Sequence, residues 1–178
     1  DFDGDGADSI SVVRGAKTAK AAATDPLAKR AFADAWKVSP EPLFYLIEAC
    51  QHEGAATFAI ASLRKDFPEA LRAPNVAWLN RLAYRRVEPV HELLVELLSG
   101  TPELHQAKLR EKGLHEAVLA LLVSPSDKAR AYAIAYARAH ATDLPVERLL
   151  ILADESGMED RFGGTYGDTA KLAADMLM

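Results

Sequence analysis

Apolar residues recur at every third or fourth position along most of the chain, which is the period of an α-helix and not of a strand. This spacing predicts about ten short helices and no series of strands, so we expect an all-α fold. The clearest apolar stripe consists of Val90, Leu93, Leu94, Leu97 and Leu98. The predicted helices cover roughly residues 26–37, 41–51, 55–66, 75–85, 88–99, 102–111, 114–123, 126–140, 145–153 and 168–178.

Proline and glycine mark the ends of these helices. Most of the nine prolines precede an apolar stretch, because proline fits the first turn of a helix and disrupts its interior. Several follow a side chain that can accept hydrogen bonds from the free N–H groups of a first turn. The predicted starts include Asp25-Pro26, Ser39-Pro40, Thr101-Pro102 and Ser124-Pro125, and the predicted ends include Gly54, Gly100 and Gly113.

The alternating alanines between Ala129 and Ala139 imitate the period of a strand. Alanine, however, is the best helix former and a poor strand former. Moreover, Ala129, Ala133 and Ala137 lie four residues apart and continue to Ala141. We therefore predict a helix, whose row of small side chains lets a neighbouring helix approach closely.

The composition narrows the class of protein. The chain has 178 residues, of which 49% are hydrophobic and 7% aromatic, which fits one ordinary domain or a few stacked helical units. A net charge of −5 argues against a strongly basic surface that binds nucleic acid. No apolar run is long enough to cross a bilayer. The single cysteine, Cys50, excludes an internal disulfide and suggests a reducing compartment, so we expect a cytoplasmic protein.

The sequence starts at Asp1 and shows no secretion signal, which suggests a processed product or a fragment of a longer chain. We expect two regions. Residues 1–24 form a flexible acidic N-terminal segment, and residues 25–178 form a helical domain that could be truncated at its C-terminal end.

A short signature recurs in the helical region. A small apolar residue, a basic residue, two free positions and a further apolar residue occur as Ala129-Arg130-x-x-Ala133, and again starting at Val90 and at Ala170. These starts lie 39 residues before and 41 residues after Ala129. Spacings of roughly this size are typical of HEAT and armadillo arrays.

The stretch Leu114–Ala139, which contains Leu-Leu-Val-Ser-Pro-Ser-Asp-Lys-Ala-Arg-x-x-Ala, resembles a HEAT-type unit. The resemblance extends over about residues 26–178 and implies a right-handed α-solenoid of about four HEAT-like helical hairpins. The chain departs from the family pattern at His91, where arginine is expected, and in a predicted third, armadillo-like helix over 102–111.

The resemblance also implies a binding surface, because each hairpin buries its apolar face against its neighbours and leaves its inner helices open. The inner helices would be 55–66, 88–99, 126–140 and 168–178. Arg130 has a second interpretation, since in HEAT-like units this residue commonly pairs with an acidic neighbour in the turn and holds adjacent repeats in register. The predicted exposed partner-binding residues are His91, Lys128, Arg130, Tyr132, Arg138 and Lys171.

The first thirteen residues carry Asp1, Asp3 and Asp5 ahead of Gly6, and alternating carboxylates before a tight turn suit a Ca²⁺ ion. The segment resembles the calcium loop of FG-GAP or integrin-type repeats. It departs from the EF-hand loop, because its twelfth residue is Val12 and not glutamate. Two interpretations of this segment remain, a weak calcium site and an acidic tail that binds no ion. We expect no other cofactor.

Catalytic patterns are weak throughout. The pairs His52-Glu53, His91-Glu92 and His115-Glu116 lack the second histidine four residues later that a zinc protease needs. Cys50 lies on an apolar stripe, where cysteine behaves as a small hydrophobe. The acidic, glycine-containing stretch 154–168 is interpreted as a mobile loop that interrupts the last unit.

These observations favour a non-catalytic scaffold that binds a protein partner or another domain of the same chain. The alternative is a nucleic-acid-associated module, which would include proteins like the HEAT-like DNA glycosylases, with positive charge from Arg85, Arg86, Arg130, Arg138 and Lys171. A third possibility, the helical part of a calcium-dependent extracellular protein, follows from the N-terminal segment alone. No interaction with a membrane is expected.

Overall fold

The computed structural model describes Leu27 and residues 30–178. This part of the chain contains nine α-helices and no strand, so the all-α prediction is confirmed for it. The Asp1–Asp5 segment and the predicted boundary at residue 24 lie outside the described residues. The helices are α1 (Glu41–Ala49), α2 (Glu53–Asp66), α3 (Val76–Leu82), α4 (Glu88–Gly100), α5 (His115–Ala120), α6 (Asp127–His140), α7 (Val146–Ala153), α8 (Glu155–Phe162) and α9 (Gly167–Leu177).

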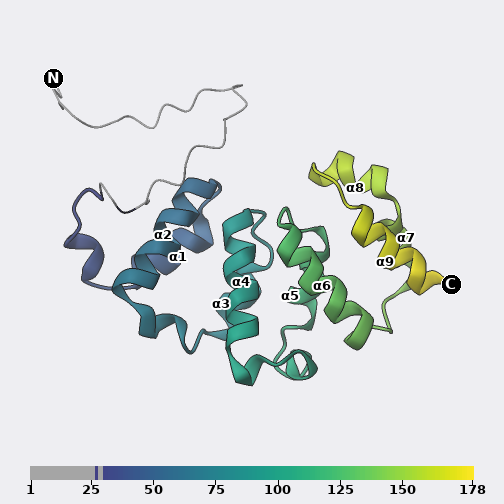
Figure 1. Ribbon diagram of the computed structural model, residues 1–178, viewed down its shortest axis with the longest axis horizontal. Coiled ribbons are helices and arrows are strands. Elements are labelled where there is room, and N and C mark those ends of the chain that lie inside the picture. The colour runs from purple at the N-terminus through teal and green to yellow at the C-terminus, as the bar shows by residue number, and fades with distance from the viewer. Residues whose placement is uncertain (1–26, 28–29) are drawn as a thin grey trace.

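The helices lie in pairs along the longest axis of the molecule (Figure 1). The pairs are α1 with α2, α3 with α4, α5 with α6, and α7 with α9. The second members also contact one another in order, α2 with α4, α4 with α6, and α6 with α9. One apolar core therefore runs the length of the row, and it is made mainly of leucine and alanine.

The alanine-rich stretch forms α6, as predicted from its spacing. Ala129, Ala133, Ala137 and Ala141 are all fully buried. Their small side chains keep this face of α6 narrow, and methyl groups let neighbouring helix backbones lie close together.

The prediction of a helix over 26–37 is wrong for the described residues 30–37. Only a short 3-10 helix, Ala35–Lys37, forms there. Phe32 has a φ of 53°, which lies in the left-handed region that an α-helix cannot include. The side chain of Arg30 donates hydrogen bonds to Ser62 at 3.2 Å and to Asp66 at 2.5 Å, so this segment is attached to α2.

The predicted third helix at 102–111 is also wrong. Two 3-10 helices, Pro102–Leu104 and Gln106–Lys108, take its place. Extended backbone at His105, with ψ of 140°, separates them. Gly113 ends the following turn with a φ of 71°, as predicted. Gly100 is the last residue of α4, as predicted, but without a positive φ, whereas Gly54 lies in the first turn of α2.

The stretch 154–168 is not simply a loop. Helix α8 occupies most of it, and the side chain of Asp154 accepts a hydrogen bond from the Gly157 N–H at 3.0 Å. Met158 is buried, and Gly163, with a φ of 67°, ends the helix. The buried Met158 and the N-terminal cap both help to order an acidic segment that looked unstructured by composition.

Candidate functional site

The second helices of the pairs carry the surface that the sequence predicts for binding. A groove lies between α2 and α4 and reaches the start of α6. Apolar side chains and charged side chains both line it. The lining residues are Thr57, Ile60, Ala61, Arg64, Pro89, Glu92, Leu93, Glu96 and Lys128.

Charges of both signs border this groove. Arg64 on α2 pairs with Glu96 on α4 at 2.5 Å, and both side chains are half-exposed. Lys128 is exposed on α6 and adds a positive charge to the border. A groove with an apolar part and a mixed-charge border suits a peptide or protein surface better than a small apolar molecule.

Acidic side chains gather where α2, α4 and α6 begin. The pKa of the Glu88 carboxyl is raised by burial first and then by the negative charges of Glu53, Glu92 and Asp127. Arg130 acts in the opposite direction. These ends of the helices therefore have a negative local potential, which the N-terminal helix dipoles partly offset.

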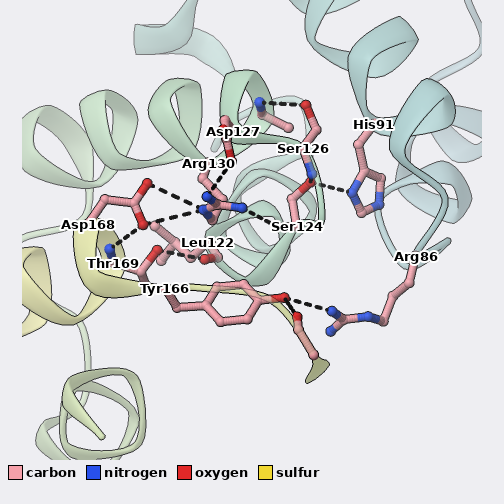
Figure 2. Close-up of polar contacts among 12 residues, drawn as sticks. Arg86, His91, Leu122, Ser124, Ser126, Asp127, Arg130, Tyr166, Asp168 and Thr169 are labelled. Carbon is pink, nitrogen blue, oxygen red and sulfur yellow. Dashed lines mark hydrogen bonds and ion pairs between the residues drawn. The ribbon is translucent and has the colours of Figure 1, made fainter. Parts of the chain in front are cut away.

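His91 is not exposed, so its prediction as a surface contact residue is wrong. Its side chain is only 1% exposed, and Nδ1 lies 2.7 Å from Ser124 Oγ (Figure 2). Burial lowers the pKa of this imidazole to about 4, with a further contribution from the charge of Arg86. A neutral histidine can be buried in the contact between α4 and the turn before α6, because the hydroxyl beside it provides a hydrogen bond.

Arg130 is also buried, at 6% exposure, so it is not available as an exposed contact residue. Its guanidinium donates to the carbonyl of Ser124 at 2.9 Å and to Asp127 Oδ1 at 2.5 Å. Its Nε lies 3.3 Å from both carboxylate oxygens of Asp168, in the first turn of α9. The alternative interpretation of Arg130 agrees with this geometry, since the arginine pairs with an acidic neighbour in the turn and links two consecutive pairs of helices (Figure 2).

The network continues into α9 through Thr169. Its hydroxyl donates to the carbonyl of Leu122 at 2.8 Å, and its N–H donates to Asp168 Oδ1 at 2.8 Å. Ser124 Oγ accepts from the Ser126 N–H at 3.0 Å, and Ser126 caps α6 by accepting from the Ala129 N–H. The cap is thus Ser126 and not Ser124, which is buried and bound to α4 instead.

Arg86 attaches the segment after α8 to the loop before α4. It donates to the Phe162 carbonyl at 3.1 Å and to the Tyr166 hydroxyl at 3.0 Å, and its guanidinium lies 4.3 Å from the centre of the Phe162 ring. Tyr166 is buried and donates to the carbonyl of Gly163 at 2.9 Å. Sequence reasoning missed this contact, because its partners are separated by 76 and 80 residues.

The remaining predicted contact residues lie on or near the surface. Lys128, Arg138 and Lys171 are exposed, and Tyr132 is partly buried. Arg138 pairs with Asp175 of α9 at 3.4 Å. Of the five basic residues considered for nucleic acid, Arg86, Arg130 and Arg138 are therefore bonded to groups of this chain, which leaves little of a continuous positive stripe.

The described residues offer little for catalysis or metal binding. Within them, no group of three or more His, Cys, Asp or Glu side chains is placed to hold a metal ion. Cys50 is buried, and this burial raises the pKa of its thiol, which makes it a poor nucleophile. Of the histidine-glutamate pairs, His115 binds the Tyr136 hydroxyl at 2.8 Å and His52 is exposed.

No helix among the described residues has both the length and the apolar character that crossing a membrane requires. The chain matches no protein-family model, no curated protein and no solved structure.

Proposed function

We propose that the chain is a right-handed α-solenoid of about four HEAT-like hairpins that acts as a non-catalytic scaffold and binds a protein partner through α2, α4, α6 and α9. The partner is another protein or another domain of the same chain. We also propose a cytoplasmic location, which the single cysteine of the sequence supports.

The regular spacing of polar contacts between neighbouring pairs of helices is the observation that carries this proposal. Arg64 bonds a residue 32 positions away, His91 one 33 positions away, and Arg130 one 38 positions away. The same spacing joins the first helices of the pairs, since Arg81 bonds Glu48 and Arg148 bonds Glu116, at separations of 33 and 32 residues. A near-constant separation is what a stack of similar units produces, because contacts there join mainly neighbouring units. Arg86, which bonds residues 76 and 80 positions away, is an exception.

The groove between α2 and α4 supports a role in binding. In a stack, the second helices share one side of the molecule, which a partner can reach. Ile60 and Leu93 form its nearly buried floor, at 4% and 1% exposure, and charged residues form its border. Such a combination is typical of surfaces that bind proteins.

The decisive experiment compares two charge reversals of matched chemistry. Glu92→Lys changes an exposed residue of the groove, and Glu41→Lys changes an exposed residue at the start of α1, away from it. Each purified variant and the unmodified chain are used to capture partners from lysate, and any captured protein is then purified and titrated calorimetrically. We expect Glu92→Lys to weaken binding by about tenfold or more and Glu41→Lys to leave it unchanged.

Equal affinity of both variants would exclude the groove as the binding surface. Retention of the unmodified chain on duplex DNA, with a strong dependence on salt, would instead support the nucleic-acid alternative, because phosphate contacts release counterions. Of the basic residues predicted for this alternative, Arg85 and the exposed Lys171 keep it open.

A further inference from the structure

Another pocket lies between the first helices of the first two pairs, on elements that do not line the groove. Its walls come from α1, from α3 and from the segment that connects α2 to α3. The volume is about 520 Å³, which is enough for a small organic ligand. The lining includes Phe44, Ala70, Ala73, Pro74, Trp78 and Arg81.

Part of the wall of this pocket is aromatic. The rings of Phe44 on α1 and Trp78 on α3 meet edge to face, with 4.8 Å between their centres and 85° between their planes. Asn75 fixes the start of α3, because its side chain accepts hydrogen bonds from the N–H groups of Ala77 and Trp78 at 2.8 and 3.2 Å. The pocket is therefore suited to an aromatic group, since such rings pack favourably against one another.

The indole of Trp78 carries a donor without an acceptor. Trp78 is 5% exposed, and its Nε1 is buried with no hydrogen-bond partner among the described residues. Most buried N–H groups have a partner, because an unpaired donor has lost its bond to water and gained none in return. Such a donor on a side chain that lines a pocket points to a ligand with an acceptor atom.

Arg81 adds a positive charge to the same face of α3, three residues after Trp78. Its Nε donates to Glu48 of α1 at 2.7 Å, and its side chain is half-exposed. Nη1 and Nη2 make no hydrogen bond within the described part of the chain. A guanidinium has five N–H groups on different edges, so Arg81 can hold Glu48 and still bind a second acceptor through Nη1 and Nη2.

From these observations we propose that the pocket binds a small aromatic carboxylate. The carboxylate receives hydrogen bonds from Nη1 and Nη2 of Arg81 and from the indole N–H of Trp78. The indole turns slightly as this bond forms, because Nε1 is covered by neighbouring atoms. The aromatic ring of the ligand lies against Phe44.

The charge of the site favours this class of ligand over two others. Charge-assisted hydrogen bonds are roughly twice as strong as neutral ones, so Arg81 prefers a carboxylate to an amide or an alcohol. Glu48 already offsets part of the charge of Arg81, so a singly charged carboxylate fits better than a doubly charged phosphate.

The test is an NMR titration of the isotope-labelled full chain with phenylacetate. The chain has two tryptophans, Trp36 and Trp78, so its spectrum contains two indole N–H signals, which the variant Trp36→Phe assigns. We expect the Trp78 signal to move and to saturate at millimolar phenylacetate, and the Trp36 signal to stay in place. Phenylacetamide has the same shape without the charge and should bind at least about tenfold more weakly.

Variants of two kinds test the charge and the space separately. Arg81→Gln should weaken the binding of phenylacetate at least about tenfold. The control Arg148→Gln breaks the corresponding ion pair with Glu116, outside the pocket, and should leave the affinity unchanged. Ala77→Leu, at an exposed position of α3 that lines the pocket, fills the space and should abolish binding. Circular dichroism checks that all three variants stay folded, which we expect because changes on the surface cost little stability.

A Trp78 signal that does not move at millimolar phenylacetate would overturn the inference. Equal affinities for phenylacetate and phenylacetamide, or for the unmodified chain and Arg81→Gln, would overturn it too. A saturable response that is confined to Trp78 and lost in Ala77→Leu supports it. The groove between α2 and α4 takes no part in this test, so its result is independent of the proposed function.

Discussion

The contact between α2 and α4 differs in kind from the contacts that join α4, α6 and α9. Where α2 meets α4, the buried side chains are mainly apolar, and the ion pair that crosses between them, Arg64 with Glu96, is half-exposed. Where α6 meets α4 and α9, a buried arginine, a buried histidine and two buried hydroxyls take part.

The two contacts contribute differently to the fold: one mainly supplies stability, and the other fixes the position of a helix. Apolar burial supplies free energy but has little direction, so similar packings at slightly different positions have similar energies. Hydrogen bonds from Arg130 and Thr169 have defined lengths and angles, so they fix where α9 lies against α6. We expect the first contact to be tolerant of substitution at its charged residues and the second to be intolerant.

The largest effect is expected from Arg130→Ala. The change leaves the buried Ser124 carbonyl without its donor and removes the link to Asp168, so we expect the free energy of unfolding to fall by about 3 kcal/mol. Urea denaturation followed by circular dichroism measures it. Arg130→Lys keeps the charge, but its single nitrogen cannot occupy the three separate positions from which Nε, Nη1 and Nη2 reach their partners. Its stability should therefore lie between those of the unmodified chain and of Arg130→Ala. A loss below about 1 kcal/mol for Arg130→Ala would show that the network is dispensable.

The second-largest expected effect is a dependence of the free energy of unfolding on pH, through the buried His91. The pKa of His91 is about 4 in the folded chain and near 6.5 when unfolded, so the unfolded chain binds more protons between these values. The stabilisation that comes from keeping His91 neutral is complete above the pKa of the unfolded chain, and it is lost as the pH falls toward about 4. Between pH 7 and pH 5 the free energy of unfolding should drop by about 2 kcal/mol from this residue.

The comparison with His91→Asn isolates this contribution, because asparagine does not titrate and the carboxylates of both chains titrate alike. Denaturation curves of the two proteins at several pH values should converge as the pH falls. Parallel curves would mean that His91 binds protons equally in the folded and unfolded chains, as it would if its imidazole lay in solvent.

The smallest effect is expected from Arg64→Ala in the apolar contact. Its ion pair with Glu96 is half-exposed and screened by water, so the free energy of unfolding should change by less than about 0.5 kcal/mol. The same urea experiment applies, with Arg130→Ala as the matched arginine deletion. A loss as large as that of Arg130→Ala would remove the distinction between the two contacts.

Local features of the sequence predicted much of the fold. The alanine row of α6 follows from helix propensity and spacing, and both are properties of neighbouring residues. The pairing of Arg130 with an acidic residue of its own turn was also within reach, because Asp127 precedes it by three positions. The helices predicted at 26–37, over its described residues 30–37, and at 102–111 are wrong, since the backbone angles at Phe32 and His105 leave no clear pattern in the sequence.

The candidate site was harder to predict, because its residues meet across long separations. His91 was expected on the surface by analogy with the basic residues at the same position of the signature. Its burial depends on Ser124, which is 33 residues away. The sequence of α8 contains a capping residue, Asp154, and one apolar residue, Met158, which together favour a helix only weakly. Its acidic and glycine-containing composition favoured a loop instead.

The attachment of Arg86 to the segment after α8 also has a consequence for the order of folding. Neighbouring pairs of helices meet over about 32–38 residues, whereas Arg86 must meet residues 76 and 80 positions away. Closing the longer loop costs more chain entropy, so contacts between adjacent pairs should form first. The stretch from α8 to Tyr166 is then among the last to acquire its native environment, and during synthesis Arg86 leaves the ribosome long before its partners do.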